Sequence, residues 1–147
     1  MATGLALNET MSGHLIWGEN NERKSFSISI CAFTTHIFAL TVPREFRGEA
    51  QLQGVSQVLP ITGQLTIYPT GPEYQINIEI PGEGSYFIQG KKTYRLRGLV
   101  KSLITCPLTV YKDGEAVGEG EIVYRDSMLK FPFTALKLMS EQEAYSL

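Results

Sequence analysis

The side chains that could carry out catalysis or bind a metal ion are few and dispersed along this sequence. The two histidines, His14 and His36, have no further ligands nearby at the spacing that a zinc site needs. If the protein had a general base, His36 would be the first candidate, because imidazole titrates near neutral pH. No serine lies in a Gly-x-Ser-x-Gly motif, which would present a nucleophile on a sharp turn. We therefore predict no catalytic residue, no bound metal and no cofactor.

Two other motifs have an ordinary structural interpretation. Glu119 and Glu121 alternate with glycines, so the two carboxylates share one face of an expected strand. Such a pair could act as general acid and base, but the pattern is also that of the solvent-facing side of a hairpin, which we favour. Residues 81–84 (Pro-Gly-Glu-Gly) resemble a phosphate-binding loop only in their glycines. This segment contains an acid and lacks the lysine and serine of a P-loop, so we expect a hairpin turn there.

Charge and cysteine content narrow the possible partners. The 147-residue chain has a formal net charge of -2, whereas a nucleic-acid-binding domain normally carries a basic excess. Cys31 and Cys106 match no metal spacing; they could pair, but two reduced thiols are the simpler expectation and fit a reducing compartment.

No apolar run approaches the ~18 residues of a membrane span. Residues 1–8 do not resemble a signal peptide, so we expect a cytoplasmic protein. The one basic cluster is expected to be a solvated strand and loop surface: Lys91, Lys92, Arg95, Arg97 and Lys101.

Alternation of apolar and polar residues with period two predicts that β-strands position these side chains. The clearest strands are expected at residues 25–32, where serines alternate with apolar side chains, and at residues 74–80, where isoleucines alternate with polar ones. Asp113-Gly114 lies between two such runs and is a strong hairpin signal. Less regular strands are expected at residues 13–17, 37–42, 46–53, 64–68, 86–89, 93–96, 108–112, 116–125 and 133–138.

The spacing of these segments predicts an all-β fold. About nine or ten strands, with little helix beyond a short turn at residues 126–131, are typical of a sandwich or barrel. Glycines inside or at the ends of strands mark the bends of a strongly coiled sheet that closes on itself; they are Gly48, Gly54, Gly118 and Gly120. We therefore predict a single antiparallel barrel domain over residues 1–147, with residues 1–9 and 140–147 as flexible or peripheral ends.

Apolar and aromatic side chains on these strands would line the interior of the barrel. Core packing accounts for most of them, but a small glycine-bent barrel could also enclose a cavity for a small hydrophobic ligand. Tyrosine hydroxyl groups would then orient the ligand. The residues expected to line such a cavity are Trp17, Phe26, Ile28, Ile30, Phe38, Tyr74, Ile76, Ile78, Tyr86, Tyr111 and Tyr124.

The order of several motifs resembles that of a known domain. The motifs are FRGEAQLQG at residues 46–54, GQLTIYP at 63–69, IQGKK at 88–92 and VGEGEI at 117–122. Over residues 11–138 the chain resembles the accessory β domain found beside some flavin-dependent GMC-type (cholesterol-oxidase-like) oxidoreductases, and stand-alone bacterial relatives of unknown function. The resemblance implies a lipocalin-like (calycin-like) barrel tied to lipid or sterol chemistry. Residues 103–108 depart from the tryptophan and threonines of the family pattern, and no Gly-x-Gly-x-x-Gly follows a predicted strand, so oxidoreductase activity is not carried over.

Three functions remain open at this point. The first, which we favour, is non-enzymatic binding of a small lipid- or sterol-like molecule inside the barrel. The second is an interaction or accessory module that packs on an oxidoreductase or on itself, which would need a large exposed apolar patch. The third is a small barrel enzyme, in which His36 and a nearby carboxylate would be the pair to look for. We expect no nucleic-acid partner and no membrane span.

Overall fold

The computed structural model describes residues 3–18, 20–34, 41–92, 105–124 and 136–140, and no helix occurs within these ranges. Its regular elements are nine β-strands that belong to one antiparallel sheet. They are β1 (Thr3–Trp17), β2 (Glu22–Thr34), β3 (Arg44–Leu52), β4 (Leu59–Tyr68), β5 (Gly71–Ile80), β6 (Gly84–Lys91), β7 (Thr105–Lys112), β8 (Glu115–Tyr124) and β9 (Leu136–Ser140).

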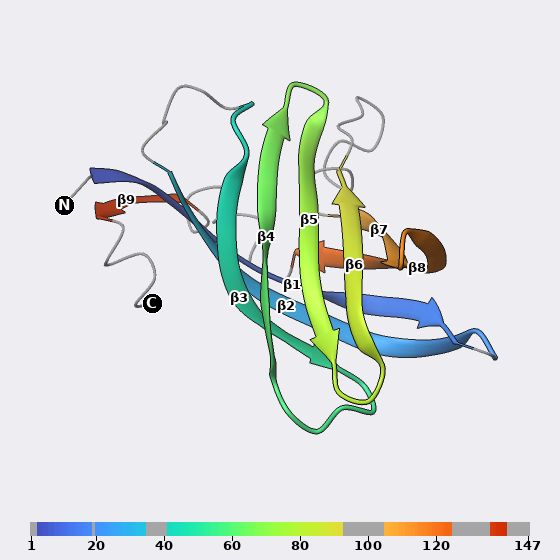
Figure 1. The fold of residues 1–147 in the computed structure, drawn as a ribbon. Helices are drawn as coiled ribbons and strands as arrows, with labels where there is room; N and C mark the ends of the chain where they lie inside the picture. Colours follow the sequence, from blue (N-terminus) through green and yellow to red (C-terminus); the bar gives the residue numbers. More distant parts are fainter. Residues whose placement is uncertain (1–2, 19, 35–40, 93–104, 125–135, 141–147) are drawn as a thin grey trace.

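The sheet closes on itself as an eight-stranded barrel. Each of the strands β1–β7 pairs with the next along the chain, and β8 pairs back with the second half of β1 from Met11 to Trp17. The ninth strand, β9, pairs with the first residues of β1, from Thr3 to Leu7. Strands β3–β6 stand upright in front in Figure 1, while β1 and β2 cross behind them. The predicted all-β antiparallel barrel is therefore confirmed, with eight strands in the barrel wall instead of nine or ten.

Strand positions follow the alternation of the sequence closely. Residues 25–32 lie in β2 and residues 74–80 in β5, as predicted. The first strand begins at Thr3 rather than at residue 13, so most of the segment 1–9 that we expected to be peripheral belongs to β1. The strand expected at 93–96 and the helical turn at 126–131 lie outside the described residues, as do residues 37–40 of the strand expected at 37–42 and most of the end at 140–147. Residues 41 and 42 are described and do not belong to a strand. Asp113 and Gly114 form the predicted hairpin turn, both with positive φ (53° and 82°).

Glycines in the barrel wall allow neighbouring strands to approach closely. A Cβ atom at Gly63 would lie 1.9 Å from the carbonyl oxygen of Gln75 and 2.6 Å from the Phe46 ring. At Gly120 it would lie 2.1 Å from the carbonyl oxygen of His14. Gly48 and Gly118 are equally crowded, as the coiled-sheet prediction requires, whereas Gly54 lies in the loop after β3 with φ 92°. Large side chains thus pack over glycines of the adjacent strand and fill the middle of the barrel, as eight strands permit.

The two ends of the barrel are connected differently. At the end where β1, β3, β5 and β7 finish, short segments join the strands: residues 18–21, 53–58, 81–83 and 113–114. At the opposite end the connections comprise residues 35–43, 69–70, 92–104 and 125–135, three of which are longer. We call the first the apolar end and the second the polar end, for the side chains described below. In the described part of the chain, no helix has the length and hydropathy needed to span a membrane.

Candidate functional site

Charged side chains point into the barrel at its polar end. Glu9 on β1, Arg44 at the start of β3 and Lys92 directly after β6 occupy inward positions, and they are 7%, 7% and 2% exposed. Tyr74 on β5 and Cys106 on β7 are buried beside them. Ionised side chains are rarely buried to this degree unless they are paired, because removal from water disfavours the charged form. This group is therefore the most unusual feature of the described interior.

Glu9, Tyr74 and Lys92 meet at one carboxylate oxygen. The Tyr74 hydroxyl donates a hydrogen bond of 2.7 Å to Oε2 of Glu9, and Nζ of Lys92 lies 3.6 Å from the same atom. Nζ of Lys92 also lies 5.4 Å from the centre of the Tyr74 ring. The backbone N–H of Lys92 donates to the carbonyl oxygen of Pro72 at 2.9 Å, which fixes Lys92 against β5. We call these three residues the polar cluster.

The polar cluster spans the interior of the barrel. In the eight-stranded ring, β5 and β1 are separated by three strands in either direction, so Tyr74 and Glu9 come from opposite walls. Lys92 follows β6, which pairs directly with β5, so Lys92 and Tyr74 belong to the same wall. A carboxylate from one wall is thus held by a cation and a hydroxyl from the other.

Burial also determines the chemistry of two neighbouring groups. Burial raises the pKa of the Cys106 thiol to about 12, an increase that Lys92 partly opposes and Glu9 reinforces. The thiol is therefore protonated near neutral pH and is not a nucleophile there. Burial lowers the pKa of the Arg44 guanidinium from its usual value, and Nη1 of Arg44 donates to the carbonyl oxygen of Val42 at 3.1 Å. Cys31 and Cys106 are not bonded to each other.

The apolar end is closed by aromatic rings. The Trp17 and Tyr86 rings lie 6.0 Å apart between centroids, and both residues are buried. Nζ of Lys24 lies 5.4 Å from the Trp17 ring and Nζ of Lys112 lies 5.1 Å from the Tyr86 ring, so two cations cover this end. Val55 in the loop after β3 packs against the core there. Described side chains thus cover the interior at this end.

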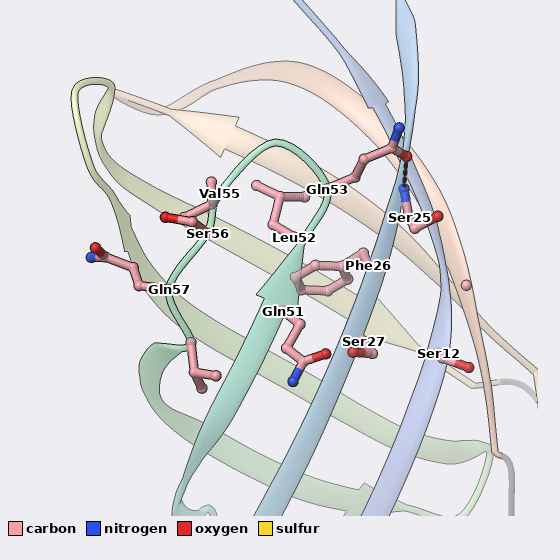
Figure 2. A pocket seen from close by; sticks show the side chains of 12 residues that line it. Ser12, Ser25, Phe26, Ser27, Gln51, Leu52, Gln53, Val55, Ser56 and Gln57 are labelled. Atoms are coloured by element: carbon pink, nitrogen blue, oxygen red, sulfur yellow. Dashed lines mark hydrogen bonds between the residues drawn. The ribbon is translucent and has the colours of Figure 1, made fainter.

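Polar side chains also line a concavity on the outer wall (Figure 2). It measures about 590 Å³ and lies over β1, β2 and β3, with residues 55–58 forming one side. Its polar residues are serines and glutamines, and Gln53 Oε1 accepts a hydrogen bond from the backbone N–H of Ser25 at 3.0 Å. Because hydroxyl and amide groups do not titrate near neutral pH, this surface has no general acid or base among its lining residues.

Most of the residues predicted to line a ligand cavity are buried in the core, and the cavity itself stays a prediction. Tyr111 is the exception, because it follows Val110 of the buried row of β7, so alternation places it on the outer wall, where its ring lies 6.0 Å from that of Phe87. Phe38 lies outside the described residues. The remaining predicted residues are buried in the core: Trp17, Phe26, Ile28, Ile30, Tyr74, Ile76, Ile78, Tyr86 and Tyr124.

The structure describes one of the two histidines that were considered as metal ligands. His14 lies on β1 between Ser25 of β2 and Glu121 of β8, in the strand register. His36 lies outside the described residues. No group of three or more His, Cys, Asp or Glu side chains that could hold a metal ion occurs in the described ranges.

Sequence reasoning missed Glu9 and Lys92. Lys92 was expected to be solvated with the rest of the basic cluster, which is wrong, since only Lys91 of the described members is exposed. A signal was present, because Glu9 stands in the period-two row before Met11 and Lys92 continues the buried row of β6. A charged residue in an inward row marks a buried charge. Arg95, Arg97 and Lys101 lie outside the described residues.

A comparison of the chain with protein-family models, with curated proteins and with solved structures finds no match.

Proposed function

We propose that this protein is a non-enzymatic binding module that takes a small lipid- or sterol-like molecule into the polar end of its barrel. The observation that carries the proposal is the polar cluster of Glu9, Tyr74 and Lys92, which lies with Arg44 inside a described interior that is otherwise apolar. Sites for small molecules typically combine an apolar wall with a few convergent polar groups, and they occur in the mouths of β-barrels.

The arrangement of the barrel supports binding from this end. Aromatic rings and lysines cover the apolar end, and glycine-backed side chains fill the middle. The inward side chains nearest the polar cluster include Leu65, which pairs with Tyr74 across β4 and β5 and is fully buried. An amphipathic ligand would place its polar group at the polar cluster and its apolar part against this wall.

Three observations favour binding over catalysis. The Cys106 thiol beside the cluster is held protonated by burial, and the Glu9 carboxylate is already engaged by Tyr74 and Lys92. His14, the histidine that the structure describes, lies on the outer face, separate from the polar cluster.

The described surface gives less support to an interaction module. Its exposed large apolar side chains are Val42 before β3, Val58 in the loop after β3, Tyr68 at the end of β4 and Val117 on β8. Val42 and Tyr68 lie at one end of the paired strands β3 and β4, Val58 follows the other end of β3 and Val117 lies on β8, whereas a docking surface of this kind usually presents a contiguous apolar patch.

The test is ligand binding by the purified full-length chain. Thermal unfolding and native mass spectrometry with a panel of fatty acids, fatty alcohols and sterols should identify at least one bound molecule per chain. Ligand at about 100 times its Kd stabilises a protein by about 2.7 kcal/mol, which corresponds to a Tm increase of roughly 5–10 °C for a chain of this size. If no member of the panel changes the Tm and the native mass is that of the bare chain throughout, the proposal is wrong.

A further inference from the structure

We infer that the ligand is a carboxylic acid and that its carboxylate replaces the Glu9 side chain at Lys92 and Tyr74. This inference rests on the proposed function and specifies the chemical class of the ligand. In the unliganded barrel, Glu9 then serves as an internal substitute for the head group of the ligand, and a neutral sterol or alcohol is a poor competitor for it.

The first argument is the placement of the three groups. Tyr74 and Lys92 belong to paired strands of one wall, and the Pro72 hydrogen bond to the backbone of Lys92 holds them together. A cation and a hydroxyl donor aimed at one oxygen form a receptor for a carboxylate, since charge-assisted hydrogen bonds are the stronger ones. Glu9 reaches that receptor across the interior from the opposite wall.

The second argument is the geometry of the ion pair. Nζ of Lys92 lies 3.6 Å from Oε2 of Glu9, which is longer than the about 2.7–2.9 Å of a good charge-assisted hydrogen bond. The Tyr74 hydroxyl, in contrast, is 2.7 Å from the same oxygen. The Glu9 carboxylate therefore lies farther from the Lys92 ammonium group than is optimal. The carboxylate of a ligand is not attached to β1, so it can approach Nζ of Lys92 more closely.

The third argument is the balance of buried charge. The displacement of Glu9 is common to an acid and an alcohol, but when the carboxylate of a ligand replaces Glu9, Lys92 keeps an anionic partner. When an alcohol displaces Glu9, Lys92 is left buried without an anion, and breaking a buried pair in this way is strongly unfavourable. The polar cluster therefore selects for acids over neutral molecules of the same shape.

The experiment compares decanoic acid with decan-1-ol, below their aggregation concentrations, by titration calorimetry and native mass spectrometry. Wild-type protein should bind the acid at least about tenfold more tightly than the alcohol, since charged partners couple strongly when desolvated. Glu9→Gln removes the competing carboxylate but keeps an oxygen for Tyr74, so the acid should bind roughly tenfold more tightly still. Glu9→Gln/Lys92→Met removes both charges and should lower acid binding to the level of the alcohol.

Controls separate folding from binding and the two proposals from each other. Glu119→Gln removes an exposed carboxylate from β8 and should leave both affinities unchanged. Circular dichroism spectra and melting curves establish that each variant is folded. Equal affinities for acid and alcohol in the wild-type protein, or weaker acid binding by Glu9→Gln, would overturn the carboxylate inference while leaving ligand binding intact. Binding of neither probe, together with a negative ligand panel, would contradict the proposed function itself.

Discussion

At its apolar end the barrel is filled by aromatic and aliphatic side chains, whereas at its polar end the same strands bury a carboxylate, an ammonium group and a guanidinium group. The apolar end is joined by short turns, and lysines cover its aromatic rings from outside. At the polar end the cations point inward instead. Because burial of apolar surface is the main source of stability, the first arrangement stabilises the fold directly.

The polar end needs a different explanation. Replacing a buried ion pair with apolar residues of similar volume is often neutral or stabilising, so stability alone does not account for Glu9 and Lys92. The proposed binding role would account for them, since recognition of a head group requires polar groups in a dry environment. On this proposal, the apolar end of the barrel supplies stability and the polar end supplies recognition.

The largest effect is expected at the apolar end. Phe26→Ala should lower the free energy of unfolding by about 3–5 kcal/mol, because it removes a large ring that is 1% exposed and leaves a cavity. Urea unfolding measures this loss. Ser25→Ala, next to it on the outer face, should change the free energy by less than about 0.5 kcal/mol. A similar loss in both variants would show that the ring is not part of a packed interior.

At the polar end, a single variant should lower the free energy of unfolding, whereas the double variant should leave it unchanged or raise it. Lys92→Met should cost about 3–5 kcal/mol, because Glu9 remains buried without its cation, whereas Glu9→Gln/Lys92→Met should be roughly neutral or more stable than the wild type. Urea unfolding of the wild type, both single variants and the double variant gives the coupling between the two residues. A double variant as unstable as Lys92→Met would mean that the ion pair contributes to stability in the way that the apolar core does.

Removing one tyrosine hydroxyl group at each end of the barrel tests the same comparison. Tyr74→Phe removes the hydroxyl that donates to Glu9 and should cost about 1.5–3 kcal/mol, the usual value for a hydrogen bond to a charged group. Tyr86→Phe keeps the ring contacts with Trp17 and Lys112, so its effect should stay below about 0.5 kcal/mol. Chemical denaturation of both variants measures the difference, and equal losses would argue against a special role of the Tyr74 hydroxyl.

The smallest effect concerns Cys106 at alkaline pH. Because the folded pKa is raised from 9.0 to about 12, the thiol ionises first in the unfolded chain. Its contribution to stability is complete below pH 9 and falls by about 1.4 kcal/mol per pH unit above it. Urea unfolding between pH 8 and 10.5 should therefore show a steeper decline for the wild type than for Cys106→Ala. Parallel declines would indicate that the thiol is accessible to water.

Much of the fold could be predicted from the sequence because alternation with period two reports directly which face of a strand is buried. Residues 25–32 and 74–80 show it clearly, and both became barrel strands with their apolar rows inward. Glycines inside strands likewise predicted a coiled, closing sheet. The prediction for Tyr111 was wrong because Tyr111 directly follows Val110, whose inward position places the next side chain on the opposite face of the strand.

The candidate site could not be predicted in the same way. The strand type, the inward rows and the hairpin at Asp113-Gly114 depend on residues close together in the chain, so they can be predicted from it. The meeting of Glu9, Tyr74 and Lys92 depends on barrel closure, which brings β1 opposite β5 and joins residues far apart in sequence. A lysine beside another lysine looks like solvated surface until the direction of its strand shows that it points inward.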